Sequence, residues 1–234
     1  MTKFADTARQ AYKEAHDLLR DPEMRSVVNG GLTILYGPPI ERPDLFLISF
    51  QGGGAEPVIY DTWPNKFLYV DDYENPLKKK TGNKFSFEKK LCKYAEEIGI
   101  YQTIKESTVA VPAVFPGAKS DDATKWANSK PGPKTDWRKF SVSWVERFVD
   151  EVKPKAIIVF GQKASKAIGL KGKWENVEGT PNRSGTIKMK FGTTIYRGFE
   201  TVFCYHLSYP DGYGGEWVKK SLRHAAKVAG MLND

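Results

Sequence analysis

Residues 155–161, KAIIVFG, constrain the fold of this 234-residue chain more than any other segment. Five consecutive apolar residues lie between Lys155 and Gly161, a run that is short for a helix and lacks the alternation of a half-exposed strand. Strands of this kind are typical of parallel sheets that are buried on both faces. The amphipathic segment 137–152 precedes the strand, and Lys153-Pro154 separates the two. A helix followed by a buried strand is therefore predicted.

The remainder of the chain alternates between strand-like and helix-like segments. Strands are predicted at 44–51, 107–116 and 201–208, a hairpin at 184–198, and amphipathic helices at 1–21, 83–100 and 214–232. The helix at 83–100 is expected to stop at Gly99. Residues 117–136, rich in Gly, Pro, Ser and Asp, are expected to form a lid or linker loop. This order predicts an α/β fold of three layers, α/β/α, with a mostly parallel central sheet.

We expect one domain at residues 31–234, with residues 1–30 as a helical arm packed on it. The formal net charge of +8 fits a polyanionic partner such as DNA, although an ordinary basic surface would also explain it. Cys92 and Cys204 are too few for a disulfide framework, a cysteine-ligated cluster or a structural zinc site. The two cysteines instead fit a reducing cytoplasm. Because the sequence shows neither a membrane span nor a signal peptide, a cytoplasmic protein without membrane association is expected. A monomer is also expected.

Polar and glycine-rich residues follow the predicted strands. In open sheets of this type, ligands bind at the carboxyl ends of the strands. Those ends carry Gln51 with three glycines, Pro116-Gly117, Gly161-Gln162 and residues 205–208. His206 lies at such an end, whereas His16 and His224 lie on predicted helix surfaces. His206 is therefore the histidine that we select as a candidate catalytic residue.

Two segments of the sequence resemble those of a known family. They are VERFVDEVKPKAIIVFGQKASKAIG at 145–169 and VFCYHLSYPDG at 202–212. Together with the glycine-rich loop after the first strand, their order resembles the uracil-DNA glycosylase superfamily, from about Leu35 to the C-terminus. The resemblance implies that fold and a monofunctional DNA glycosylase, which needs no metal and no cofactor, flips a base out of the helix and hydrolyses its N-glycosidic bond. It also implies that His206 faces the scissile bond.

The sequence departs from that family at two places. In the first motif, Gly52 stands where the family usually has Asp, Asn or Ala, and Gly53 where it has Pro. Val109 stands near the position of an asparagine that reads uracil. Both departures predict a wide pocket for a bulky modified pyrimidine, such as a sugar-decorated cytosine of phage DNA, and a role in phage defence. The resemblance does not fix whether the DNA is duplex or single-stranded.

Candidate residues for each task follow from the chemistry and from the resemblance. Glu56 and Asp61 are equal candidates for positioning the water, with Gln51 a weaker, uncharged one. The expected base pocket comprises Gly52, Gly53, Gly54, Tyr60, Trp63, Phe67 and Val109, although for any single aromatic a place in the core is the better expectation. The expected DNA contacts are Ser208, Tyr209, Gln162, Lys163, Ser165 and Lys166, supported by basic loops at 76–84 and 129–139.

Other functions remain open at this point. A non-catalytic nucleic-acid-binding relative would also fit, since Gly52 replaces the residue that activates water in the family. A repair glycosylase for uracil or deaminated purines is a further alternative. A nucleotide-binding enzyme is less consistent, because the glycine run lacks the Lys-Ser/Thr of a phosphate-binding loop and the spacing of a dinucleotide fingerprint.

Overall fold

The structure is a computed structural model of the chain. It describes residues 2–51, 59–65, 68, 73–74, 87–117, 126, 130–171, 175–182, 185–204, 206–207 and 215–232. Within this part of the chain, no helix has the length and apolar character needed to cross a membrane.

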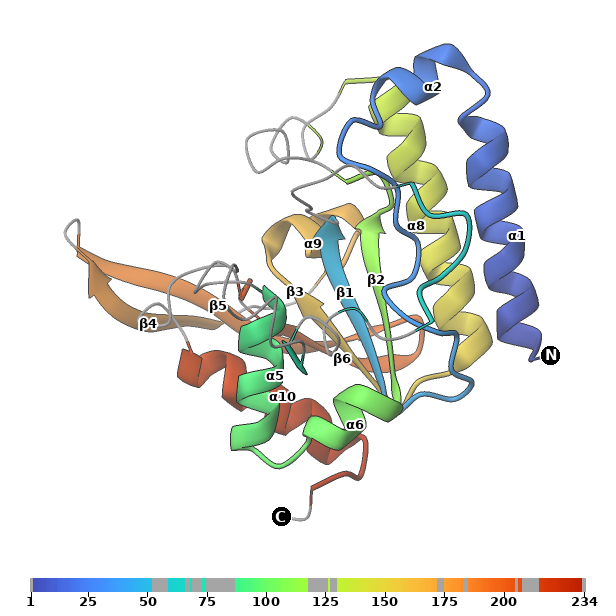
Figure 1. Ribbon diagram of the computed structural model, residues 1–234. Helices are drawn as coiled ribbons and strands as arrows, with labels where there is room; N and C mark the ends of the chain where they lie inside the picture. The colour runs from blue at the N-terminus through green and yellow to red at the C-terminus, as the bar shows by residue number, and fades with distance from the viewer. Residues whose placement is uncertain are drawn as a thin grey trace.

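A six-stranded mixed sheet forms the centre of the molecule (Figure 1). Its strands are β1 (Leu45–Gln51), β2 (Thr108–Val114), β3 (Ala156–Phe160), β4 (Glu175–Asn182), β5 (Gly185–Tyr196) and β6 (Phe199–Cys204), in the spatial order β2-β1-β3-β6-β5-β4. The first four strands in that order are parallel, and β5 and β4 are antiparallel to their neighbours. The predicted α/β class with a mostly parallel sheet is confirmed.

Helices cover both faces of the parallel strands. One face packs against α1 (Lys3–Leu18), α2 (Pro22–Ser26), α8 (Pro133–Val152) and α9 (Gln162–Ala167). The other face packs against α5 (Phe87–Glu97), α6 (Tyr101–Glu106) and α10 (Gly215–Val228). In Figure 1, α1 and α8 lie together on one side of the sheet, and α5, α6 and α10 lie on the other.

The wholly apolar strands follow from this two-sided burial. In β3, Ile157 and Val159 contribute to the core under α8, whereas Ala156, Ile158 and Phe160 contribute to the core under α5 and α10. Successive side chains of a strand point to opposite faces, so every position of β3 must be apolar. The residues of β3 are all buried, as the sequence predicted.

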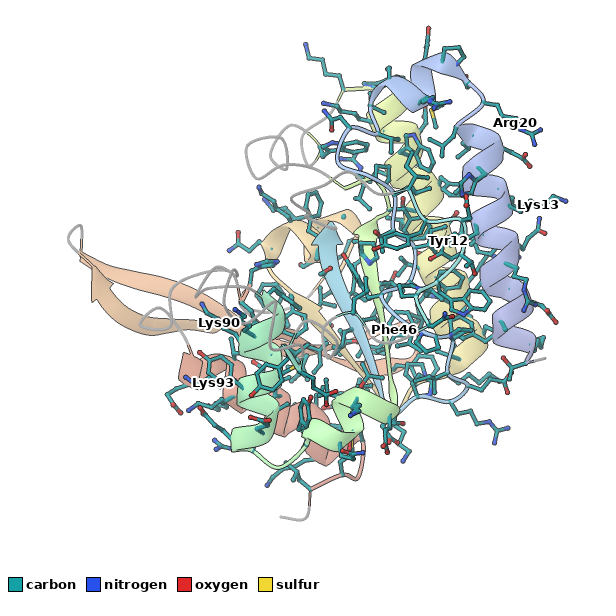
Figure 2. All side chains as sticks on the ribbon, viewed as in Figure 1. Tyr12, Lys13, Arg20, Phe46, Lys90 and Lys93 are labelled. Carbon is teal, nitrogen blue, oxygen red and sulfur yellow. The ribbon has the colours of Figure 1, made fainter. Side chains whose placement is uncertain are left out.

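The N-terminal helix is part of the main core. Phe4 and Tyr12 are almost completely buried, and the ring of Phe4 lies 5.5 Å from that of Phe148 in α8. The Tyr12 hydroxyl accepts a hydrogen bond from the Leu35 N–H at 3.2 Å, and burial raises its pKa well above the usual value. Figure 2 shows Tyr12 pointing inward from α1, while Lys13 and Arg20 point away from the molecule. Residues 3–18 therefore pack against the core through the buried face of α1.

Helix α8 begins earlier than the sequence predicted. It starts at Pro133 instead of Trp137, so much of the basic segment 129–139 is helical and not a loop. Proline is favoured in the first turn because its missing N–H has no helical partner there. The earlier start places Arg138 in the second turn of a long helix, where its direction is fixed.

The predicted hairpin at 184–198 is wrong in its boundaries. Residues 185–196 form the single strand β5, in which Gly192 pairs with Phe203 of β6. The turn lies at Arg197-Gly198, where both residues have positive φ values of 55° and 86°. Two such residues in succession suit the tight hairpin turns that match strand twist. β4 pairs with the first part of β5, and this pair extends away from the body in Figure 1.

Candidate active site

His206 lies two residues beyond the end of β6, at the edge where the parallel strands end. It is half-buried, and its surroundings come from two other elements. A Cβ atom added at Gly161, directly after β3, would lie 3.1 Å from the His206 Cβ, so glycine permits this close approach. Gly161 also has φ of +86°, which disfavours other residues. The Gly161 N–H donates to the Cys204 carbonyl at 2.8 Å, which joins the ends of β3 and β6.

The first turn of α5 packs on the other side of this histidine. The rings of Phe87 and His206 have centroids 5.3 Å apart and are tilted by 46°. Phe87 also makes an edge contact with Phe160, the last residue of β3, at 5.0 Å. The imidazole is therefore held between the end of β3 and the start of α5.

His206 is neutral at physiological pH. Burial, together with the positive charges of Lys163 and Lys90, lowers its pKa from 6.5 to about 4. Because the folded-state value is depressed, the unfolded chain takes up this proton first as the pH falls. The folded state therefore loses up to about 3 kcal/mol of stability as the pH drops from 6.5 toward 4. At pH 7 the side chain can donate one N–H hydrogen bond without carrying charge.

Lys90 is a component of the site that the sequence interpretation missed. Figure 2 shows it on α5. It lies one turn after Phe87, and only 3% of its surface is exposed. Phe87, Leu91 and Tyr94 mark the buried face of this helix, and Lys90 lies beside them. A lysine on the apolar face of an amphipathic helix was the available signal, since buried lysines are rare.

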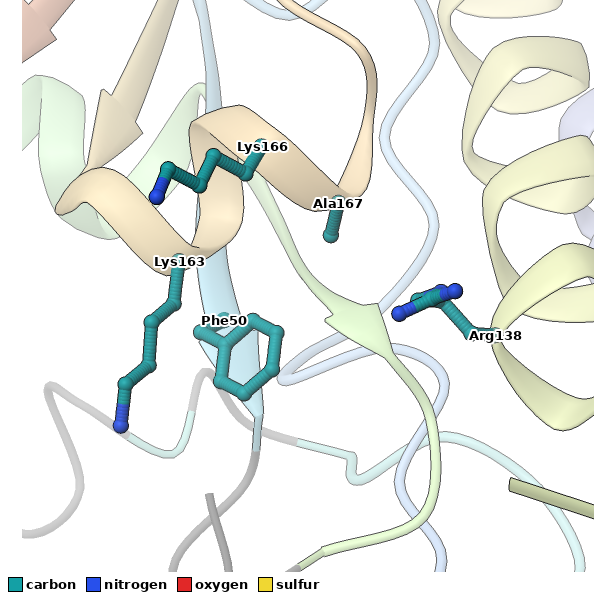
Figure 3. A pocket seen from close by; sticks show the side chains of 5 residues that line it. All are labelled: Phe50, Arg138, Lys163, Lys166 and Ala167. Atoms are coloured by element: carbon teal, nitrogen blue, oxygen red, sulfur yellow. The ribbon is translucent and has the colours of Figure 1, made fainter. Parts of the chain in front are cut away.

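A basic pocket of about 250 Å³ lies next to this site. It is lined by Phe50 at the end of β1, Arg138 of α8, and Lys163, Lys166 and Ala167 of α9. Figure 3 shows Arg138 reaching toward α9, from which Lys163 and Lys166 project one turn apart. One guanidinium nitrogen of Arg138 donates to the Trp126 carbonyl at 3.3 Å. The pocket brings together two predicted DNA contacts, Lys163 and Lys166, with two residues that were not predicted to line a pocket, Phe50 and Arg138.

The two other predicted DNA contacts on α9, Gln162 and Ser165, differ in their exposure to solvent. Gln162 is exposed at the start of the helix, which is compatible with its predicted role. Ser165 is buried, with 5% of its surface exposed. Its N–H donates to the Gly161 carbonyl and its carbonyl accepts from Leu170, so its backbone shapes the helix and its end. The prediction that Ser165 contacts DNA is corrected: its side chain packs in the interior.

The prediction that Val109 lines the base pocket is also wrong. It is the second residue of β2, pairs with Phe46 and has only 2% of its surface exposed. The carboxyl end of β2, which shares the edge with His206, is Val114. Val109 is five residues away from that end and belongs to the core, so it does not line a base pocket. The resemblance placed it too early in the strand.

Asp61, Tyr60 and Trp63 lie against α1 and not beside His206. The Asp61 Oδ1 atom is 3.4 Å from His16 Nε2, which also contacts the Tyr60 carbonyl at 3.1 Å. Trp63 packs edge-on against Tyr12 at 6.4 Å between ring centroids. These contacts belong to the core opposite that of Phe87. Of the residues that the structure describes, Asp61, Tyr60 and Trp63 are therefore not assembled around His206.

Of the remaining predicted residues, only Gln51 lies in the part of the chain that the structure describes. Gln51 ends β1 and pairs with Val114, so its backbone is at the predicted edge. Seven further predictions lie outside the described residues. They are Gly52, Gly53, Gly54, Glu56, Phe67, Ser208 and Tyr209.

Comparison with known proteins adds no further residue to the site. No protein-family model matches the sequence, and no curated protein matches it. Among the described residues, no group of three His, Cys, Asp or Glu side chains is arranged to hold a metal ion. The candidate site is therefore defined by geometry, with His206, Phe87, Lys90, Gly161 and Lys163 at the carboxyl edge of the sheet.

Replacing Lys163 with glutamine is expected to raise the pKa of His206, because it removes one of the two positive charges that oppose protonation. The matched control is Lys166→Gln, which removes a charge from the same helix that does not contribute to the lowered value. Titration of the histidine ring protons by NMR, assigned with a His206→Gln variant, measures both. Equal pKa values in the wild type and Lys163→Gln would contradict the predicted electrostatic contact.

Proposed function

We propose that this protein is a monofunctional DNA glycosylase, which hydrolyses the N-glycosidic bond of a flipped-out, non-canonical base. One observation carries the proposal: His206 is neutral and half-buried at the carboxyl edge of the parallel sheet, close to the charges of Lys163 and Lys90. The adjacent basic pocket offers contacts for a nucleic-acid backbone. The resemblance of residues 145–169 and 202–212 to the uracil-DNA glycosylase superfamily supports the same activity.

The chemistry requires that the base depart with the bonding electrons. As the bond from C1′ to the base nitrogen breaks, positive charge develops on the sugar and negative charge on the base. The neutral His206 donates an N–H hydrogen bond to a carbonyl oxygen of the departing base, and the two lysines stabilise its negative charge. A depressed pKa favours this role, since the histidine stays a hydrogen-bond donor and does not act as an acid.

Water completes the reaction at the sugar. It adds to C1′ and releases a proton, which leaves a hydroxyl group on an abasic site, while the base anion takes up a proton. Glu56, the remaining carboxylate candidate for positioning this water, lies outside the described residues. The role of Glu56 in positioning the water therefore stays a prediction from the sequence.

The substrate proposed for this activity is DNA that carries a bulky modified pyrimidine. Gly52 and Gly53, which replace larger residues of the family motif, support the choice, whereas Val109 does not contribute. The test incubates the protein with DNAs that contain glucosylated hydroxymethylcytosine, uracil or hypoxanthine, followed by alkali to cut abasic sites. We expect the fastest base release from the glucosylated base. Release of only uracil or hypoxanthine would instead assign a repair glycosylase.

A second candidate is a non-catalytic nucleic-acid-binding protein. The position of Asp61 favours it, because this carboxylate contacts His16 of α1 and is not assembled with His206. The same panel separates the two functions. Binding to DNA without base release from any of the three substrates would support the non-catalytic protein.

A further inference from the structure

β4 and the first part of β5 form a two-stranded ribbon, residues 175–182 and 185–191, that continues beyond the end of β6. Gly192 of β5 pairs with Phe203, one residue before the end of β6. The earlier residues of β5 lie past this point and pair with β4. Figure 1 shows the ribbon extending away from the body. Because His206 follows β6 by two residues, the ribbon and the candidate active site start at the same edge of the sheet.

The ribbon has dimensions that fit a DNA duplex. At roughly 3.4 Å per residue, the β5 part of the ribbon spans about 20 Å. One DNA strand advances about 3.4 Å per nucleotide along the helix axis, so this length corresponds to about six base pairs. The major groove, about 12 Å wide, admits a two-stranded β-ribbon. A single strand has no groove of this kind.

The acidic residues of the ribbon lie near its base. Glu175 pairs in register with Phe191, and Glu178 pairs with Lys188. Residues 179–187, beyond them in the sequence, contain no acidic residue. The same stretch is rich in residues with hydroxyl, amide or guanidinium groups, namely Thr180, Asn182, Arg183, Ser184 and Thr186. Groups of these kinds bind phosphate oxygens in protein–DNA complexes, so the composition of the outer part of the ribbon fits a nucleic-acid backbone.

We propose that the ribbon binds the sugar-phosphate backbone of duplex DNA beside the flipped base. The choice of DNA as the partner rests on the proposed glycosylase function. Arg183, between the two strands, and Lys190, which pairs in register with Asn176, supply the positive charge that binds phosphate. The substrate is therefore a duplex that extends about six base pairs to one side of the target base.

The experiment uses the full chain and an unmodified duplex of about 20 base pairs, titrated at several salt concentrations between about 50 and 200 mM. Arg183→Gln/Lys190→Gln is expected to weaken binding about tenfold. Each lost phosphate contact lowers the slope of log Kd against log salt by about 0.9, so the double variant should lower it by up to about 1.8. The wild type should also prefer the duplex over its separate strands, and the variant should lose most of this preference.

Two further variants serve as controls. Lys13→Gln/Arg20→Gln removes the same charge from α1, where both side chains point away from the molecule (Figure 2), and it should retain the wild-type slope. Arg183→Lys/Lys190→Arg keeps both charges in the ribbon and should also retain it. Retention by this variant shows that the loss in the glutamine variant comes from the missing charge.

Three outcomes decide the proposal. Equal salt slopes for the wild type and Arg183→Gln/Lys190→Gln, or an equal loss in the α1 control, would overturn it. A lowered slope in the ribbon variant, with no base release by the wild type from any modified DNA, would reject the glycosylase function and leave the ribbon contact intact. A dimer in sedimentation velocity that the ribbon variant dissociates, with an unchanged salt slope, would assign the ribbon to a second copy of the chain and overturn the DNA contact.

Discussion

Replacing His206 with alanine is expected to lower the rate of base release at least about 100-fold, while the Kd for DNA changes by less than about threefold. The reason is that the imidazole N–H stabilises negative charge that develops only in the transition state, and losing one such donor typically costs 10²–10³ in rate. Single-turnover base release and a binding titration on the same DNA measure the two effects separately.

The control for this experiment is His224→Ala. His224 lies on α10, where its Nε2 is 2.9 Å from Glu200 Oε1, a surface contact away from the carboxyl edge of the sheet. Its removal should leave base release unchanged. If His206→Ala weakened binding and turnover equally, the histidine would have a structural role between Gly161 and Phe87. Full activity would exclude it from the mechanism.

The largest effect on stability is expected for Trp137→Ala, which should lower the free energy of unfolding by about 3–5 kcal/mol. Trp137 has no exposed surface, packs edge-on against Phe140 at 5.6 Å between ring centroids, and donates from Nε1 to the Met24 carbonyl at 2.9 Å. Alanine would leave a cavity and remove the hydrogen bond that joins α8 to α2. Urea unfolding, followed by circular dichroism, measures the change.

Trp137→Phe separates packing from hydrogen bonding at the same site. It retains much of the ring volume but removes the donor, so we expect a smaller loss of about 1–3 kcal/mol. Equal losses for the two variants would mean that the hydrogen bond dominates. A loss below 1 kcal/mol for alanine would contradict the predicted cavity cost.

Local patterns predicted several elements because the forces that set them are local. The apolar run of β3, the amphipathic periodicity of α1 and the stop at Gly99 each depend on neighbouring residues, and the structure confirms all three. Gly99 has φ of +79°, a conformation that glycine adopts without a steric penalty. His206 is placed at a strand end by the same reasoning, and its position there is confirmed.

Two mistaken predictions show where local patterns fail. Residues 184–198 were predicted to form a hairpin, but pairing with β6 on one side and β4 on the other extends β5 across that segment. Val109 was assigned by its approximate place in a motif, yet the register with Phe46 places it near the start of its strand. Pairing between strands decides both cases.

The sequence by itself determined the class of fold, and it predicted the carboxyl edge as the place for a site with His206 as its histidine. Only the tertiary structure decided which side chains join it there. Lys90 comes from α5 and Lys163 from α9, segments that are far apart in the chain, and the charges of both act on His206. Asp61 is close to Gln51 in sequence but is held against α1 by His16. Two residues that are close in sequence can lie far apart in space, because the packing of helices on the two faces of the sheet sets their distance.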